Sequence, residues 1–193
     1  MKTIKKMNRT ALGFLAIMIL FIGQMNAQDF KLNNSASKLT VFGTSNLHDW
    51  DVKAENQSGT ISLDASNNVK QLKLNVVAES LKSGKSGMDK NTYKALDTGK
   101  HKNITFDMKS LKSISSTGSN MYKVVVSGDL RIAGKTNRTD IEFTMNTSSG
   151  KVVLKGKKAL KMTDFGVTPP KALLGSITTG DAITIEFETT FTH

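Results

Sequence analysis

The sequence contains no cysteine, only three histidines and only two prolines, which are adjacent. Without thiols the chain can form no disulfide and has no thiol redox chemistry of its own. No proline-rich linker, internal repeat or low-complexity tract divides the chain after its first 27 residues. These absences favour one domain that is stabilised by an ordinary apolar core.

Aromatic residues are also scarce, at 6% of the chain, although the formal net charge is +11. A positive excess could suit nucleic acid or anionic lipid head groups. The lysines are scattered singly, however, and few aromatic side chains are available to stack on bases. The composition therefore does not favour nucleic-acid binding, and a solvated basic surface explains the positive charge.

Long apolar runs are absent except near the N-terminus. Four basic residues precede an apolar run over residues 11–23, and Ala27 follows at a plausible cleavage point. This is the layout of a secretory signal peptide, whereas a membrane-spanning helix needs roughly 20 apolar residues. We predict a signal peptide over residues 1–27 and a periplasmic or secreted protein.

The remaining residues, 28–193, have a suitable length for one domain with its own core. The first 27 residues hold four of the 27 basic residues and none of the 16 acidic ones, so this domain carries a net charge of +7.

Apolar and polar residues alternate with a period of two through most of the domain, which indicates half-buried strands. The pattern occurs at residues 39–46, 58–64, 69–80, 104–110, 121–132, 141–145, 151–162 and 182–191. Clusters of Gly, Asn and Ser at residues 66–68, 116–120, 133–137 and 148–150 predict hairpin turns between them. Residues 86–100 break the rhythm, and Met88, Tyr93 and Leu96 fit a short helix that Gly99 ends.

We therefore predict an all-β fold, a lipocalin-like closed antiparallel β-barrel of about eight strands with a short helical insertion. Closure hides the apolar face of such a sheet and removes its exposed edges. An eight-stranded barrel is either filled by side chains or holds one small ligand. The predicted interior and ligand-binding residues are apolar, so an open interior would bind an apolar molecule. They are Phe42, Trp50, Leu72, Leu74, Val76, Ile104, Phe106, Met108, Val124, Val126, Leu130, Ile132, Ile141, Phe143, Ile183, Ile185 and Phe187.

Two alternatives remain at this stage. A structural or interaction barrel with a filled core would bind no ligand. A small outer-membrane barrel also alternates, but it needs strands of about 9–11 residues and girdles of aromatic residues. Most alternating runs here are shorter, and aromatic residues are few.

The segment GTSNLHDW, residues 43–50, gathers the only tryptophan and one of the three histidines. A metal site would need three or four converging ligands, and a catalytic site would need a partner for Ser45. We interpret the segment as a structural corner or lid at the barrel mouth, in which His48 and Asp49 bind loop backbone and Trp50 closes the end.

Two other motifs have simpler explanations. GKT at residues 134–136 lacks the earlier glycine of a phosphate-binding loop and lies between two strands, so we expect a hairpin turn. DFG at residues 164–166 has none of the accompanying kinase motifs. We expect Phe165 to pack on the barrel near its mouth.

Six segments follow one another in order: GTSNLHDW, MDKNTYKAL, KNITF, YKVVVSGDLRIAGKT, KMTDFGVTPP and GDAITIEFE. In these segments, which span most of the domain, the chain resembles the YceI-like lipid- or polyisoprenoid-binding family. The resemblance implies an elongated apolar cavity for an isoprenoid or other long amphiphile, no catalysis, no cofactor, no stable membrane insertion, and a homodimer as one oligomeric state. The chain departs from the family at Lys102-Asn103, where a proline is usual, and at Ala95-Leu96, where aromatic residues are common.

Overall fold

A computed structural model describes residues 28–148 and 150–193, so the predicted signal peptide lies outside the described residues. Strands dominate it. They are β1 (Gln28–Leu32), β2 (Lys38–Ser45), β3 (Trp50–Ala54), β4 (Gln57–Leu63), β5 (Val69–Val77), β6 (Leu81–Lys82), β7 (Asn103–Gly118), β8 (Met121–Ile132), β9 (Lys135–Asn146), β10 (Lys151–Lys161), β11 (Lys171–Ala172) and β12 (Ile177–Thr192). One helix, α2 (Ser86–Leu96), and four short 3-10 turns, η2 (Asn34–Ala36), η3 (Ala78–Ser80), η4 (Met162–Phe165) and η5 (Leu173–Gly175), complete the described part.

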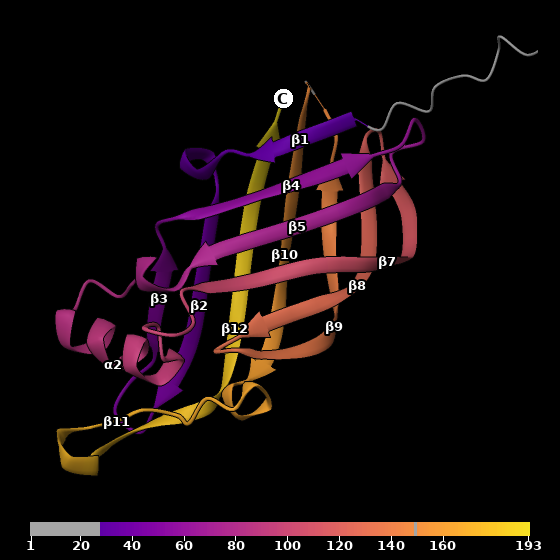
Figure 1. Cartoon of the computed structure of the whole chain (residues 1–193). Coiled ribbons are helices and arrows are strands. Elements are labelled where there is room, and N and C mark those ends of the chain that lie inside the picture. Colours follow the sequence, from indigo (N-terminus) through magenta and orange to yellow (C-terminus); the bar gives the residue numbers. More distant parts are fainter. Residues whose placement is uncertain (1–27, 149) are drawn as a thin grey trace, which may run out of the picture.

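Eight strands close into an antiparallel barrel in the order β1-β4-β5-β7-β8-β9-β10-β12 (Figure 1). Closure occurs where β12 pairs with β1, at Lys31–Thr192 and Leu32–Phe191. Further along the same edge of β12 lies β2, and the 3-10 turn η2 separates β1 from β2. The sheet continues beyond β2 to β3 and β6. The predicted fold is confirmed.

The sequence pattern marked the strand centres better than the strand ends. Strands β7 and β12 each extend over 16 residues, and β1 and β3 were not predicted. The second half of β7 is largely exposed, so apolar alternation gives no signal there. Strand β1 depends on pairing with β12 at the far end of the chain, whereas β3 forms a hairpin with β2 after the corner before Trp50.

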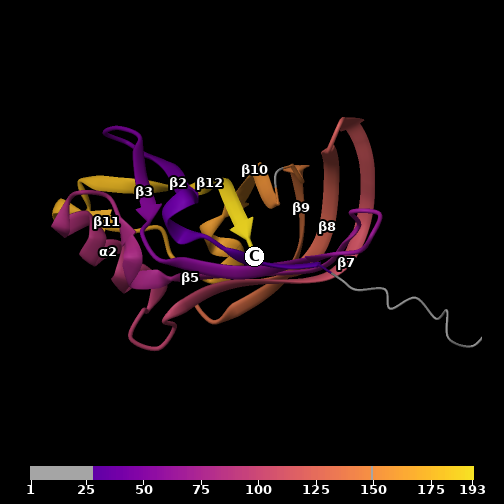
Figure 2. The same ribbon diagram turned by 90° about the horizontal axis from the view of Figure 1, so that it is seen from above.

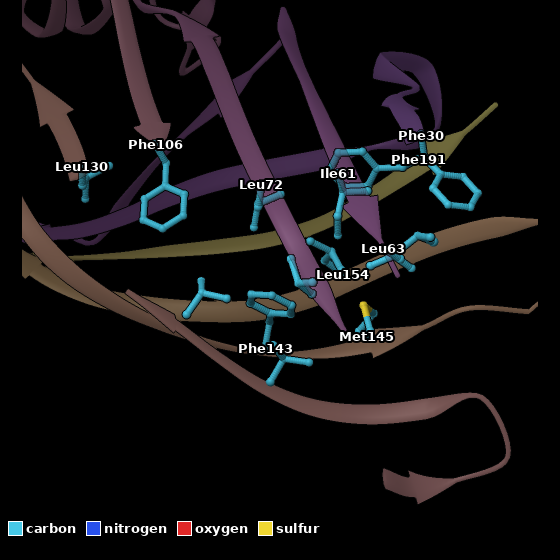
Figure 3. Packing of buried hydrophobic residues seen from close by; sticks show 14 of the residues in the cluster. Phe30, Ile61, Leu63, Leu72, Phe106, Leu130, Phe143, Met145, Leu154 and Phe191 are labelled. Atoms are coloured by element: carbon cyan, nitrogen blue, oxygen red, sulfur yellow. The ribbon is translucent and has the colours of Figure 1, made fainter. Parts of the chain in front are cut away.

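A packed apolar core fills one half of the barrel. The fully buried side chains there come from neighbouring strands and meet across the interior (Figure 3), and they include Ile61, Leu63, Met145, Leu154 and Phe191. A second, smaller cluster of Val52, Val76 and Leu81 lies at the other end, beside α2. The barrel strands and both clusters lie within the predicted domain, residues 28–193.

Helix α2 lies beside β3 and β6 at the less filled end of the barrel (Figures 1 and 2). Its start is held by Asp89, which accepts hydrogen bonds from the Ser83 hydroxyl at 2.6 Å and the Ser83 backbone N–H at 2.8 Å. These two bonds lower the pKa of the Asp89 carboxyl below its ordinary value, so it stays ionised. The helix ends at Asp97 (φ 48°) rather than at Gly99, because Asp97 adopts the left-handed conformation and its N–H bonds back to the last turn. Among the described residues, no helix is long and apolar enough to cross a membrane.

Candidate ligand cavity

A cavity of about 880 Å³ occupies the half of the barrel that the core leaves open. All eight barrel strands contribute residues to its wall, together with β2, β3 and β6, and α2 and the β11–β12 hairpin border it as well. In both ribbon views α2, β3 and β11 lie at the same end of the molecule (Figures 1 and 2). Exposed residues among the lining, such as Lys171, Leu173 and Leu174, mark the mouth at this end.

Thirteen of the predicted interior residues line this cavity. They are Trp50, Leu72, Leu74, Val76, Ile104, Phe106, Leu130, Ile132, Ile141, Phe143, Ile183, Ile185 and Phe187. Their contact with a ligand stays a prediction. His48 and Phe165, expected near the mouth, also line the cavity, whereas Asp49 is exposed and does not.

Four predicted interior residues do not line the cavity, for three different reasons. Phe42 lies on the outside of β2 with 41% of its side chain exposed, because its neighbours Val41 and Gly43 face inward. Val124 and Val126 are fully buried in the packed half of the barrel, where the interior is filled. Met108 is half-buried and packs against that same core.

Sequence reasoning missed several lining residues. Leu39 and Val41 belong to the inward set of β2, which a one-residue shift of the alternation would have identified. Met88 and Leu96 were predicted to belong to a short helix, but nothing local indicated that they border the cavity. Leu81 reaches the wall through pairing between β3 and β6, which depends on the tertiary fold.

Hydrogen bonds of Ser45 organise the corner at residues 43–50, whose structural role stays our interpretation. The Ser45 hydroxyl donates to the His48 carbonyl at 2.7 Å and accepts from the backbone N–H of His48 at 3.1 Å. Trp50 donates through Nε1 to the Thr44 carbonyl at 2.9 Å, which satisfies its one polar atom while its ring lines the cavity. His48 Nδ1 lies 2.8 Å from the Asp49 carbonyl.

Asn46 joins this corner to the β11–β12 hairpin. Its side-chain amide donates to the Ser176 carbonyl and accepts from the Thr178 backbone N–H, each at 2.9 Å. Its own backbone N–H donates to the Thr178 carbonyl at 3.1 Å. Three bonds therefore hold two loops distant in sequence as one rim of the mouth.

Gly43 is required for the position of Trp50. A Cβ at this residue would overlap the indole ring, so we expect Gly43→Ala to displace Trp50 and to lower the free energy of unfolding by about 1–3 kcal/mol. Because Trp50 is the only tryptophan, a red shift of the fluorescence emission will report its movement toward water. Gly99→Ala is the matched control, since a Cβ there meets open space. An unchanged emission in Gly43→Ala would contradict this role.

The side chains of the cavity lining that are always charged are all positive. Five lysines contribute to its lining, namely Lys85, Lys90, Lys158, Lys161 and Lys171, and no carboxylate does. Within residues 28–148 and 150–193, none of these five makes an ion pair. The nearby Asp181 already accepts from the Thr163 hydroxyl at 2.7 Å, a bond that lowers the pKa of this carboxyl.

Two buried polar atoms of the cavity wall lack a hydrogen-bond partner among the described residues. They are Nε2 of Gln57 and Oγ1 of Thr189, and their residues are only 4% and 1% exposed. An unpaired buried donor costs about 1–3 kcal/mol. Such atoms beside a cavity are suited to receive a polar atom of a bound molecule or a water.

The remaining motifs from the sequence form turns, and a metal site is not found among the described residues. The described residues contain no group of three or more His, Asp or Glu side chains that could hold a metal ion. GKT at residues 134–136 lies in the β8–β9 hairpin, where Ala133 (φ 47°) and Gly134 (φ 81°) form the turn. The DFG segment forms η4 and ends at Gly166.

A small closed antiparallel barrel with a large apolar cavity at one end defines the class of lipocalin-like barrels. Within that class, the chain belongs to the family of the YceI-like domain, whose model matches residues 30–191. Among curated proteins, no sequence matches the chain.

Solved structures agree on the fold. The chain is similar to BcnA of Burkholderia cenocepacia, with a TM-score of 0.67 and 17% identity over 82% of this chain and 98% of that one. A polyisoprenoid-binding domain from Saccharophagus degradans, implicated in plant cell wall breakdown, gives a TM-score of 0.66 and 13% identity over 84% and 97%. The YceI protein of Campylobacter jejuni gives 0.54 and 18% over 70% and 80%. At these identities the similarity shows the fold.

Proposed function

We propose that this protein is a non-enzymatic carrier that holds one long apolar or amphiphilic molecule, of the polyisoprenoid class or similar, inside the barrel. The single observation that carries the proposal is the cavity of about 880 Å³ with its predominantly apolar wall. Membership of the YceI-like family and the polyisoprenoid-binding character of the Saccharophagus relative support the ligand class. The predicted signal peptide supports a periplasmic or secreted location.

Affinity would come mainly from burial of the chain of the ligand. Each CH₂ group removed from water contributes about 0.8 kcal/mol, so a long hydrocarbon chain needs few polar contacts. The packed core closes one end of the space, and the exposed residues of the mouth mark the other. The ligand would therefore enter from the α2 and β11 end.

The head group would stay near the lysines of the mouth. Five lysines without a carboxylate among the lining suit a polar or anionic group at this position. Gln57 Nε2 and Thr189 Oγ1 would provide a second polar contact deeper in the wall, for a hydrogen-bond acceptor within the ligand or a trapped water.

Mass spectrometry of lipid extracted from residues 28–193, purified without detergent from a bacterial host, tests the proposal. We expect a long-chain isoprenoid or similar lipid in up to equimolar amount, and a raised melting temperature when stripped protein is given polyprenols or isoprenoid quinones. Absence of both results would favour the alternative of a barrel with a ligand-free structural role.

A further inference from the structure

Three exposed leucines stand on the rim of the cavity mouth. Leu47, in the loop between β2 and β3, is 65% exposed. In the β11–β12 hairpin, Leu173 is 72% exposed and Leu174 is fully exposed. Leu173 and Leu174 also line the cavity. Single exposed leucines are common on protein surfaces, but a group of them beside the opening of an apolar cavity is not accounted for by the barrel fold.

The backbone holds two of these side chains outward in an unusual conformation. Leu173 (φ 49°) and Leu174 (φ 54°) are both left-handed, a region that branched apolar residues seldom occupy. Glycine or asparagine would adopt it with less strain. Strain that persists in a loop of this kind is a reason to look for a function of the side chains it presents.

The rim is also held together and positively charged. Asn46 binds Ser176 and Thr178, so the loop of Leu47 and the hairpin of Leu173 and Leu174 form one unit. Four lysines of the cavity lining, Lys85, Lys90, Lys161 and Lys171, are exposed, while the β2–β3 loop adds one exposed carboxylate, Asp49. Apolar tips surrounded by lysines are typical of surfaces that bind the interface of an anionic bilayer.

We propose that this rim docks the mouth of the barrel on the surface of an anionic lipid bilayer, with the three leucines in the interfacial region and the lysines on the head groups. The positive charge of the rim favours an anionic bilayer over a second copy of the chain as its partner. A second copy of the chain would bring its own rim lysines against these in a two-fold contact, which like charges oppose. Docking in this orientation places the cavity opening toward the lipid, so a cargo molecule could pass without crossing water. The inference does not require any particular cargo.

Co-flotation with vesicles tests it. Residues 28–193 are mixed with vesicles of phosphatidylcholine alone or of phosphatidylcholine with phosphatidylglycerol, and we expect binding that the anionic lipid strengthens and that salt weakens. The variant is Leu173→Asn with Leu174→Asn, because asparagine tolerates the left-handed backbone and the hairpin should keep its shape. We expect this double variant to bind anionic vesicles at least about tenfold more weakly. Phe42→Ser, which removes an exposed apolar side chain from the outer wall, should bind as the wild type does.

Three results would overturn the proposal: no binding of the wild type to anionic vesicles, unchanged binding of the double variant, or equal binding to both vesicle types. Light scattering on the same samples tests whether a second copy of the chain covers the rim instead. A wild-type dimer that becomes a monomer in the double variant would assign the rim to this second copy. Extracted lipid is measured in parallel. Leu47→Ser changes the one rim leucine that does not line the cavity, so weaker vesicle binding with the wild-type amount of lipid in this variant separates docking from cargo binding. A wild type without lipid that still binds vesicles would count against the carrier function alone.

Discussion

Val41→Trp is expected to abolish lipid retention while the barrel stays folded. Val41 lies on β2, lines the cavity and pairs with Ile185 and Val52 on the flanking strands. An indole at this position would occupy the space of about four or five CH₂ groups of a ligand, each worth about 0.8 kcal/mol. The loss of about 3–4 kcal/mol corresponds to a dissociation constant roughly 100- to 1,000-fold higher.

The neighbouring residue provides the control. Phe42→Trp adds aromatic bulk one position further along the same strand, but its side chain points to the outside of the barrel. Mass spectrometry of extracted lipid, with circular dichroism and a melting curve for each variant, separates a lost ligand from a lost fold. Lipid retained in Val41→Trp at the wild-type level would mean that the ligand does not occupy this part of the cavity.

Phe191→Ala is expected to cause the largest loss of stability of any single truncation on β12. Phe191 is completely buried, in the packed half of the barrel, where β12 meets β1 and closes the sheet. Truncation of a buried phenylalanine in a tightly packed core lowers the free energy of unfolding by about 3–5 kcal/mol, because the cavity that remains cannot collapse.

Phe187, four residues earlier on the same strand, is the matched comparison. It faces the cavity and is only partly buried, so fewer contacts are lost on truncation. We expect Phe187→Ala to cost less than half as much, measured by urea unfolding of lipid-free protein, since a bound ligand would stabilise the folded state. Equal losses for the two variants would show that the space beside Phe187 is packed as tightly as the core.

The sequence predicted the barrel because each strand has one apolar and one polar face, and the Gly/Asn turns separate the strands clearly. It predicted twelve wall residues for the same reason, and Trp50 from the corner at residues 43–50. It could not distinguish Val124 and Val126, which fill the interior, from Leu130 and Ile132 of the same strand, which border the open half. Both pairs have the same alternation, and only the packing of β8 against the other strands decides between them.

The cavity lining also contains residues that alternation alone could not identify, because strand pairing or the tertiary fold determines their position. Phe42 was predicted to face inward, whereas the pairing of β2 with β12 and β3 places Val41 inward. The lysines of the cavity lining come from β10, α2, β11 and the residue before α2, and only the fold brings them together. Asn46 could not be distinguished as the link between two loops, because its partners lie 130 and 132 residues away in the sequence.

The division of the barrel into a solid half and a hollow half places core residues and cavity-lining residues at different positions along the same strands, such as Phe191 and Phe187 on β12. Substitutions around the hollow half can change which molecule fits without removing the contacts that keep the sheet closed. A lineage built on this plan could thus exchange one cargo for another through a few wall residues, while its architecture persisted through extensive sequence divergence.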